Sequence, residues 1–172
     1  MKATERLGQI TTIKGKAKVL FVVEGLSEQF YNARELAESA RQGTLAQQRV
    51  AMEALEHFSR RRAFQMHDEI LEFIVLGLDS KDATLKREAA RLTANCAHFA
   101  SERLDHLLPL VLKNLEDNGT VVRWGAALAF EAIVRNRAFQ GGDLRALVEE
   151  LMQREEKQSI RKILFRSILY IR

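Results

Sequence analysis

The sequence predicts an all-α fold, a solenoid in which short helical hairpins stack one on another. Three observations predict it. The 172 residues include only nine glycines and one proline, so few residues interrupt helices. Apolar residues recur at helical spacing almost everywhere after residue 16, as at Ile70, Ile74 and Leu78. The helical segments also repeat with a period of about 37 residues, which is typical of solenoids.

Composition and charge restrict the class of protein further. The chain is 47% hydrophobic and 29% charged, which is too apolar for a disordered chain and too charged for a membrane protein. The longest apolar run, residues 19–23, is far shorter than the roughly 20 residues that a membrane span needs. Cys96 is the single cysteine, which excludes an intramolecular disulfide and suits a reducing compartment. We therefore expect a cytoplasmic protein that does not enter a membrane.

Helical periodicity defines the expected elements. We expect helices at residues 17–25, 28–41, 45–59, 66–78, 83–99, 102–115, 120–136, 143–154 and 157–171. Side-chain oxygens that can accept a hydrogen bond from a free backbone N–H mark four of the starts, at Ser27, Thr44, Ser101 and Asp143. Thr44 is also followed three residues later by Gln47, which predicts a capping box.

Residues 1–26 do not match the repeat, and we expect them to cap the solenoid. A solenoid needs a cap because its terminal hairpin has one neighbour fewer than the others. The segment 19–26 is rich in valine, which is typical of a strand, but Val19, Val22 and Leu26 also share one helical face. We favour a capping helix over a strand.

Each repeat is a helical hairpin whose second helix opens at an aligned polar or basic position. Aligning Gln48, Lys86, Arg123 and Arg161 gives spacings of 38, 37 and 38 residues. A hairpin of this length cannot bury its apolar face alone, so successive hairpins should share one continuous core. We therefore expect a single domain with a cap at residues 1–26 and four repeats at about 27–62, 63–100, 101–137 and 138–172.

The third repeat carries a motif known from a family. Pro109 lies in the expected first helix, Asp117 follows at the turn and Arg123 lies in the second helix. This pattern resembles that of HEAT repeats, a family of armadillo-type α-solenoids in which the proline kinks the first helix and acids and bases of successive repeats form a hydrogen-bond ladder. The resemblance implies a right-handed α-solenoid of about four HEAT-like hairpins, with Arg123 bonded near the inter-repeat turns. The fourth repeat keeps the acid and base, as Glu155 and Arg161, without the proline.

No motif for catalysis, cofactor binding or metal binding stands out. Gly15 and Lys16 lack the glycine spacing of a phosphate-binding loop, and Ala17 stands where Ser or Thr must bind magnesium. The four histidines include no two at a spacing that shares a helix face. We expect no cofactor and no metal, and interpret Cys96 as a small core residue.

One set of surface residues remains as a candidate binding site. Residues one and five positions after the aligned position should project together from the second helices, and Arg135 should lie one turn further along the same surface. The resemblance to HEAT repeats implies that the second helices line the concave face. The candidate partner-binding residues are Arg49, Glu53, Arg87, Arg91, Trp124, Leu128, Arg135, Lys162 and Arg166. A tryptophan among arginines is typical of an interface anchor or of a base-stacking platform. The alternative is that Trp124 packs against the next repeat.

We therefore expect a non-enzymatic interaction module that binds a protein or peptide on its concave second-helix surface. Nucleic-acid binding is an alternative that the basic residues favour and the nearby carboxylates of Glu53, Glu56 and Glu88 oppose. A HEAT-like DNA glycosylase is a further alternative, for which Trp124 and Glu131 are the suggestive pair. The segment 157–172 is apolar on more than one face, which predicts weak self-association.

Overall fold

The computed structural model describes residues 1–100, 103–136 and 142–171 of the chain. Within these residues it contains α-helices and short 3₁₀ helices and no strand, which confirms the all-α solenoid. The elements are α1 (Ala3–Gln9), η1 (Ile10–Thr12), α2 (Ala17–Ser27), α3 (Ala33–Arg41), α4 (Leu45–Ser59), α5 (Asp68–Asp79), α6 (Ala83–Cys96), η2 (Ala97–Phe99), η3 (Leu104–His106), α7 (Leu108–Leu115), α8 (Thr120–Asn136), α9 (Gly142–Arg154) and α10 (Gln158–Ile168).

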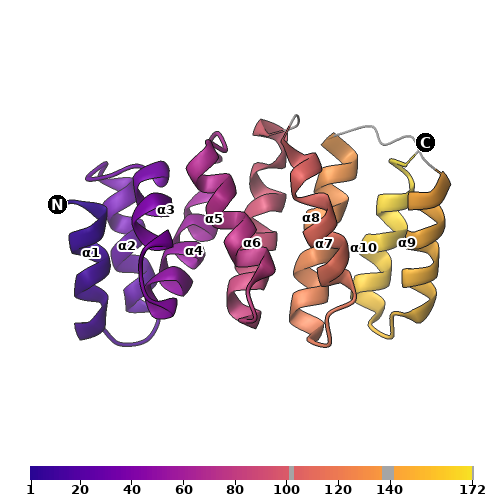
Figure 1. Ribbon diagram of the computed structural model, residues 1–172, viewed down its shortest axis with the longest axis horizontal. Helices are drawn as coiled ribbons and strands as arrows, with labels where there is room; N and C mark the ends of the chain where they lie inside the picture. Colours follow the sequence, from indigo (N-terminus) through magenta and orange to yellow (C-terminus); the bar gives the residue numbers. More distant parts are fainter. Residues whose placement is uncertain (101–102, 137–141, 172) are drawn as a thin grey trace.

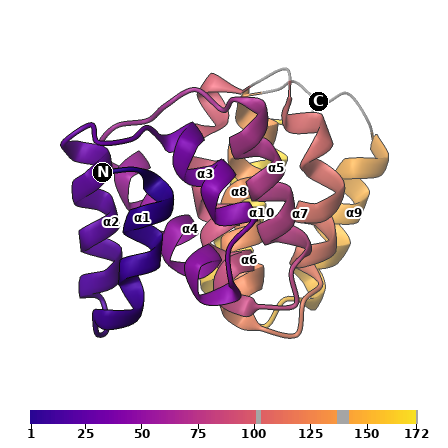
Figure 2. The same cartoon turned by 60° about the vertical axis from the view of Figure 1, so that its left-hand side comes forward.

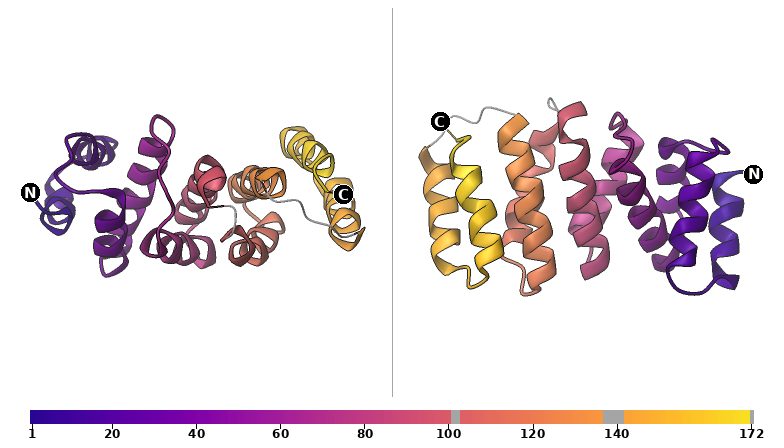
Figure 3. Two further views of the ribbon diagram at one scale, coloured as in Figure 1. Left: turned by 90° about the horizontal axis from the view of Figure 1, so that it is seen from above. Right: turned by 180° about the vertical axis from the view of Figure 1, so that it is seen from behind.

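The helices form two layers that run along the length of the molecule (Figure 1). Odd-numbered helices make one layer and even-numbered helices the other, and each even helix packs against the next even helix in the chain. Seen from above, the even layer is bowed inward at its middle, so it lines the concave side of the stack (Figure 3). The second helices of the hairpins therefore form the concave surface.

The N-terminal segment folds as a helical pair. The helix expected over residues 17–25 is confirmed as α2, where Val22 and Leu26 are buried, and α1 precedes it without having been predicted. Figure 2 shows the two helices side by side at one end of the stack. Arg6 of α1 joins them, because its side chain donates to the Phe21 carbonyl at 2.8 Å and pairs with Glu24 at 2.7 Å.

The start predicted for the next helix is wrong. Ser27 ends α2, and the chain then turns through Gln29, whose φ of 60° lies in the left-handed region. The helix α3 begins only at Ala33, after Asn32, whose Oδ1 accepts a hydrogen bond from the backbone N–H of Glu35 at 2.9 Å. Asparagine is as good an N-cap as serine, so side-chain chemistry alone did not distinguish the two positions.

Other helix starts agree better with the sequence. The capping box at α4 is confirmed: Thr44 Oγ1 accepts from the Gln47 backbone N–H at 3.3 Å, and Gln47 accepts from the Thr44 N–H at 2.8 Å. Helix α9 begins at Gly142, one residue before the predicted start, so Asp143 lies in its first turn, where a negative charge interacts favourably with the helix dipole. Ser101 lies outside the described residues.

The proline of the HEAT-like motif does not kink a helix. The segment expected as one helix over 102–115 contains η3 and then α7, and Pro109 lies in the first turn of α7. A proline in the first turn loses no intrahelical hydrogen bond, because the N–H that it lacks would have no partner there. Pro109 therefore begins the helix where the resemblance implied a kink.

Small residues bring the even helices close together. A Cβ added to Gly125 of α8 would lie 3.3 Å from the Arg87 carbonyl oxygen and 3.4 Å from the Ala90 Cβ of α6. Cys96 is fully buried in the same core, as expected, and burial raises the pKa of its thiol to about 11. The thiol is therefore protonated at neutral pH and acts as a small apolar group.

A ladder of ion pairs joins one helical pair to the next along the stack. Its rungs are Arg49 with Asp82, Lys86 with Asp117 at 2.6 Å, and Arg123 with Glu155 at 2.7 Å. Each base lies near the start of an even helix, and each acid lies in the turn before the following even helix. Arg123 also donates to the Asp117 carbonyl at 2.9 Å, so it is bonded at the turns within the third and fourth repeats, and not at the turns between repeats as predicted.

The substitution Arg123→Ala tests the ladder. We expect it to lower the free energy of unfolding by about 2 to 3 kcal/mol, because it leaves the buried Glu155 carboxylate without its partner. Urea denaturation would measure the change. The matched control is Arg145→Ala, which removes an exposed pair with Glu149 inside α9 and should change stability by less than about 0.5 kcal/mol. Equal effects of the two substitutions would contradict a structural role for the ladder.

Candidate functional site

A groove of about 410 Å³ lies on the even layer between α4, α6 and α8. We call it the concave groove and define it by Arg91, Trp124, Leu128, Glu131 and Arg135, which line it together with neighbouring residues. It combines an indole, aliphatic side chains and both signs of charge. A groove with this mixture can hold an apolar side chain and orient polar groups around it.

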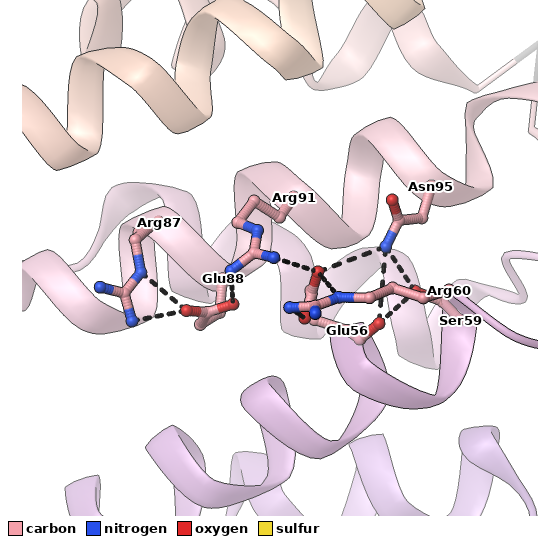
Figure 4. Close-up of polar contacts among 7 residues, drawn as sticks. All are labelled: Glu56, Ser59, Arg60, Arg87, Glu88, Arg91 and Asn95. Carbon is pink, nitrogen blue, oxygen red and sulfur yellow. Dashed lines mark hydrogen bonds and ion pairs between the residues drawn. The ribbon is translucent and has the colours of Figure 1, made fainter.

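The base of the concave groove contains two buried carboxylates. Glu56 of α4 and Glu88 of α6 are only 1% and 2% exposed. Arg91 bridges them, with Nη2 at 3.0 Å from Glu56 and Nη1 at 3.3 Å from Glu88 (Figure 4). Arg60 donates twice to Glu56, at 2.7 and 2.6 Å, and Arg87 donates to Glu88 at 2.7 Å. The cluster therefore crosslinks α4 and α6 beneath the groove.

Burial and the neighbouring arginines act on the Glu88 carboxyl in opposite directions. Removal from water raises the pKa of the Glu88 carboxyl, while the hydrogen bond from Arg87 and the charge of Arg91 lower it by a smaller amount. From the sequence, Glu56 and Glu88 were expected only as carboxylates near the basic residues, and this cluster was not predicted. The signal that could have revealed it is local, since Arg60 and Arg91 lie four and three residues after the two acids.

The structure brings four of the nine sequence-predicted residues together. Arg91, Trp124, Leu128 and Arg135 all line the concave groove, and Arg87 reaches its base through Glu88.

The other predicted residues lie elsewhere. Arg49 belongs to the ladder, through its pair with Asp82, and not to the groove. Glu53 is half-buried on α4 outside the groove lining. Lys162 and Arg166 lie on α10 and line a separate hollow at the end of the stack. Arg166 also reaches the groove, because it pairs with Glu131 at 2.9 Å.

Trp124 lies where the core meets the concave groove. It is half-buried against the hydrophobic core, and its ring also lines the concave groove. The Arg91 guanidinium carbon lies 5.8 Å from the centre of this ring, within the range of a cation–π contact. A half-buried indole that is held by its neighbours loses little conformational freedom when a ligand packs on it.

Ion pairs flank an apolar centre along the groove. Arg91 of α6 pairs with Glu56 of α4, and Arg166 of α10 pairs with Glu131 of α8. The two ion pairs therefore occupy equivalent positions, each between one even helix and the next. Between them, Leu128 lies at the position of the arginines, so an apolar side chain replaces an ion pair. The middle of the groove therefore offers a ligand side chain the apolar surfaces of Leu128 and Trp124, with charged residues on either side.

Two further properties concern the described residues as a whole. Nowhere in them do three or more His, Cys, Asp or Glu side chains gather in a way that could hold a metal ion. Their helices also include none with the length and apolar character needed to cross a membrane.

Comparisons with known proteins give structural neighbours only. No model of a protein family matches the chain, and no curated protein matches it. The chain is similar to an engineered protein from the Northeast Structural Genomics Consortium, with a TM-score of 0.62 and 14% identity, over 98% of this chain and 78% of that one. It is also similar to a designed armadillo repeat protein in complex with the peptide (KR)4, with a TM-score of 0.58 and 13% identity, over 99% and 82% of the two chains. This likeness shows a helical-repeat solenoid and does not distinguish HEAT from armadillo repeats.

The substitution Glu88→Gln tests the buried cluster through its pH dependence. Because the folded-state pKa of Glu88 is raised above its ordinary value of 4.5, the folded chain binds this proton more tightly than the unfolded chain. The protonated Glu88 carboxyl therefore stabilises the fold fully when the pH is below the pKa that Glu88 has in the unfolded chain. This stabilisation is lost as the pH rises through the pKa that Glu88 has in the folded chain. We therefore expect the stability of Glu88→Gln, relative to wild type, to increase as the pH rises above that ordinary value.

Urea unfolding of both proteins between about pH 4 and pH 7 would measure this difference. The control is Glu116→Gln, which changes an exposed carboxylate. Stability curves for Glu88→Gln and wild type that run parallel across this range would contradict the proposed effect of burial.

Proposed function

We propose that this chain is a helical-repeat module that binds a peptide segment of a partner protein in the concave groove. The observation that carries the proposal is the position of Trp124 and Leu128, which form an apolar centre on the inward-curved layer of an open solenoid. The designed armadillo repeat neighbour, which holds a peptide, supports a peptide as the kind of partner. Binding a peptide requires no catalytic step, and we propose that the module is not an enzyme.

Charge narrows the kind of peptide that would fit. The carboxylates that line the groove are already engaged, Glu56 by Arg60 and Arg91 and Glu131 by Arg166. Arg135, by contrast, has no carboxylate partner among the described residues. Within the described part of the groove, a bound peptide would therefore meet the unpaired cation of Arg135 and no unpaired acid. We propose a peptide with an apolar or aromatic side chain for the centre of the groove and a neighbouring Asp or Glu for Arg135.

Nucleic-acid binding is less well supported. Of the basic residues that favoured it, three have carboxylate partners: Arg87, Arg91 and Arg166. A cation that already has a carboxylate partner must give it up before it can bind a phosphate, which removes much of the electrostatic gain. The glycosylase alternative needs a free acid beside Trp124, and Glu131 is paired with Arg166.

Peptide titrations test the proposal directly. Trp124 is the only tryptophan, so its fluorescence reports on the groove alone. We expect a short peptide in which leucine or phenylalanine alternates with glutamate to change this fluorescence and to bind in the micromolar range, since the apolar contact area is small. A lysine–arginine repeat peptide should bind at least about tenfold more weakly, a difference of roughly 1.4 kcal/mol.

Two variants locate the binding site. With a dye-labelled peptide, Arg135→Ala should weaken binding about fivefold, by roughly 1 kcal/mol, and Trp124→Ala by about thirtyfold or more. Arg91 is unsuitable for this purpose because it neutralises two buried acids. The matched control is Arg145→Ala on the opposite layer, which should leave binding unchanged. Acidic peptides that bind Trp124→Ala and wild type equally well would contradict the proposed site.

A separate titration tests the nucleic-acid alternative. We expect no binding to random duplex or single-stranded DNA or RNA tighter than about 10 micromolar at 0.15 M salt, since so few cations are free. Labelled oligonucleotides titrated at several salt concentrations would measure it. Submicromolar binding that weakens steeply with salt would contradict the peptide proposal and favour a nucleic-acid partner.

A further inference from the structure

Helix α10, at one end of the described stack, contains a ladder base with no acid described against it. Lys86, Arg123 and Arg161 occupy the same place in α6, α8 and α10, because the backbone N–H of each donates to the carbonyl four residues earlier, at the start of its helix. Lys86 and Arg123 each pair with an acid in the next turn. No carboxylate among the described residues pairs with Arg161.

The apolar part of the same helix face is also uncovered. Four residues after the ladder base, Ala90 of α6 and Ala127 of α8 are 1% and 0% exposed, but Phe165 of α10 is 59% exposed. Leu169, the C-cap residue just after α10, is 71% exposed. Phe165 and Arg161 line one hollow of about 560 Å³ together with Met152. In α6 and α8 this face packs against the next helical pair. Helix α10 has the equivalent face, and no described residue covers it.

We propose that this face of α10 docks a helical pair of a partner protein whose inter-helix turn carries an Asp or Glu. The acid would pair with Arg161, as Glu155 pairs with Arg123 in the stack. The second helix of the pair would pack on Phe165 and present a small residue to it. Within the stack, Gly125 serves this purpose where α8 approaches Ala90 of α6. The docking face is separate from the concave groove, so this inference does not rest on the proposed peptide binding.

A second copy of this chain fits the α10 face less well. The acids of its own turns are already paired within its ladder, as Asp82, Asp117 and Glu155. The turn between its first two helices carries Lys14 and Lys16 and no acid, so a head-to-tail contact would place cations against Arg161. A two-fold contact would bring the basic residues of one α10 against those of the other. Charge therefore favours an acidic partner over the weak self-association that the sequence predicted.

An extended chain tests the docking face. The extended chain carries a second copy of residues 97–136, joined directly after Arg172. The number of residues between Arg161 and the copied Asp117 is then the same as between Arg123 and Glu155. The copied Gly125 supplies the small residue. Amide hydrogen exchange followed by mass spectrometry should show α10 exchanging at least about tenfold more slowly in the extended chain than in the original chain.

Swapping the charges of Arg161 and the copied Asp117 tests the role of Arg161 in the extended chain. Asp117→Lys in the copy alone should return much of the exchange rate of α10 to that of the original chain. Adding Arg161→Glu to that variant should slow exchange again, because the ion pair is restored in reverse. Circular dichroism would verify that each variant keeps its helices.

Three results would overturn the inference. The first is an extended chain in which α10 exchanges as in the original chain. The second is a copied Asp117→Lys that has no effect on exchange. The third is a dimer of the original chain in sedimentation that Phe165→Glu abolishes, which would make a second copy the occupant.

Discussion

Close packing between neighbouring even helices is the constraint from which the rest of the structure follows. A helical pair of this length leaves an apolar face that only another pair can cover, so the core is continuous along the stack. Small residues such as Ala90 and Gly125 allow the helices to approach closely. The ladder then fixes their register, because the base of each even helix meets an acid in the turn before the next. Burial supplies the attraction and the ladder selects one alignment among several.

The same close approach determines the character of the concave surface. When even helices lie this near each other, an arginine of one helix reaches a glutamate of its neighbour, as Arg91 reaches Glu56 and Arg166 reaches Glu131. A surface that looks strongly charged in the sequence is therefore largely neutralised within itself. Among the described residues that line the groove, the apolar centre around Trp124 and the cation of Arg135 are left without an ion-pair partner. The proposed peptide would be recognised by these few groups.

Local signals in the sequence were sufficient for most of the fold. The repeat period placed the helical pairs, and the capping box at Thr44 placed the start of α4. The helix α1 was missed because it is short and has few apolar residues, and Ser27 was preferred to Asn32 because both can cap a helix. Register also predicted which residues share the groove, such as Trp124 and Leu128. It could not show which carboxylate an arginine pairs with across about 35 residues of chain, since that depends on the spacing between helices.

The strongly packed helices belong to the same pair or to adjacent pairs, which has a consequence for how the chain folds. Contacts between residues close in sequence form without closing long loops, so a protein built from them folds rapidly. The middle of the stack, where the Arg91 cluster crosslinks α4 to α6 and α8 packs closely on α6, can organise first. Folding then spreads outward in both directions, one pair at a time. By the same logic the two outermost pairs open most readily, so under mild denaturation the molecule should unravel from its ends while its centre stays intact.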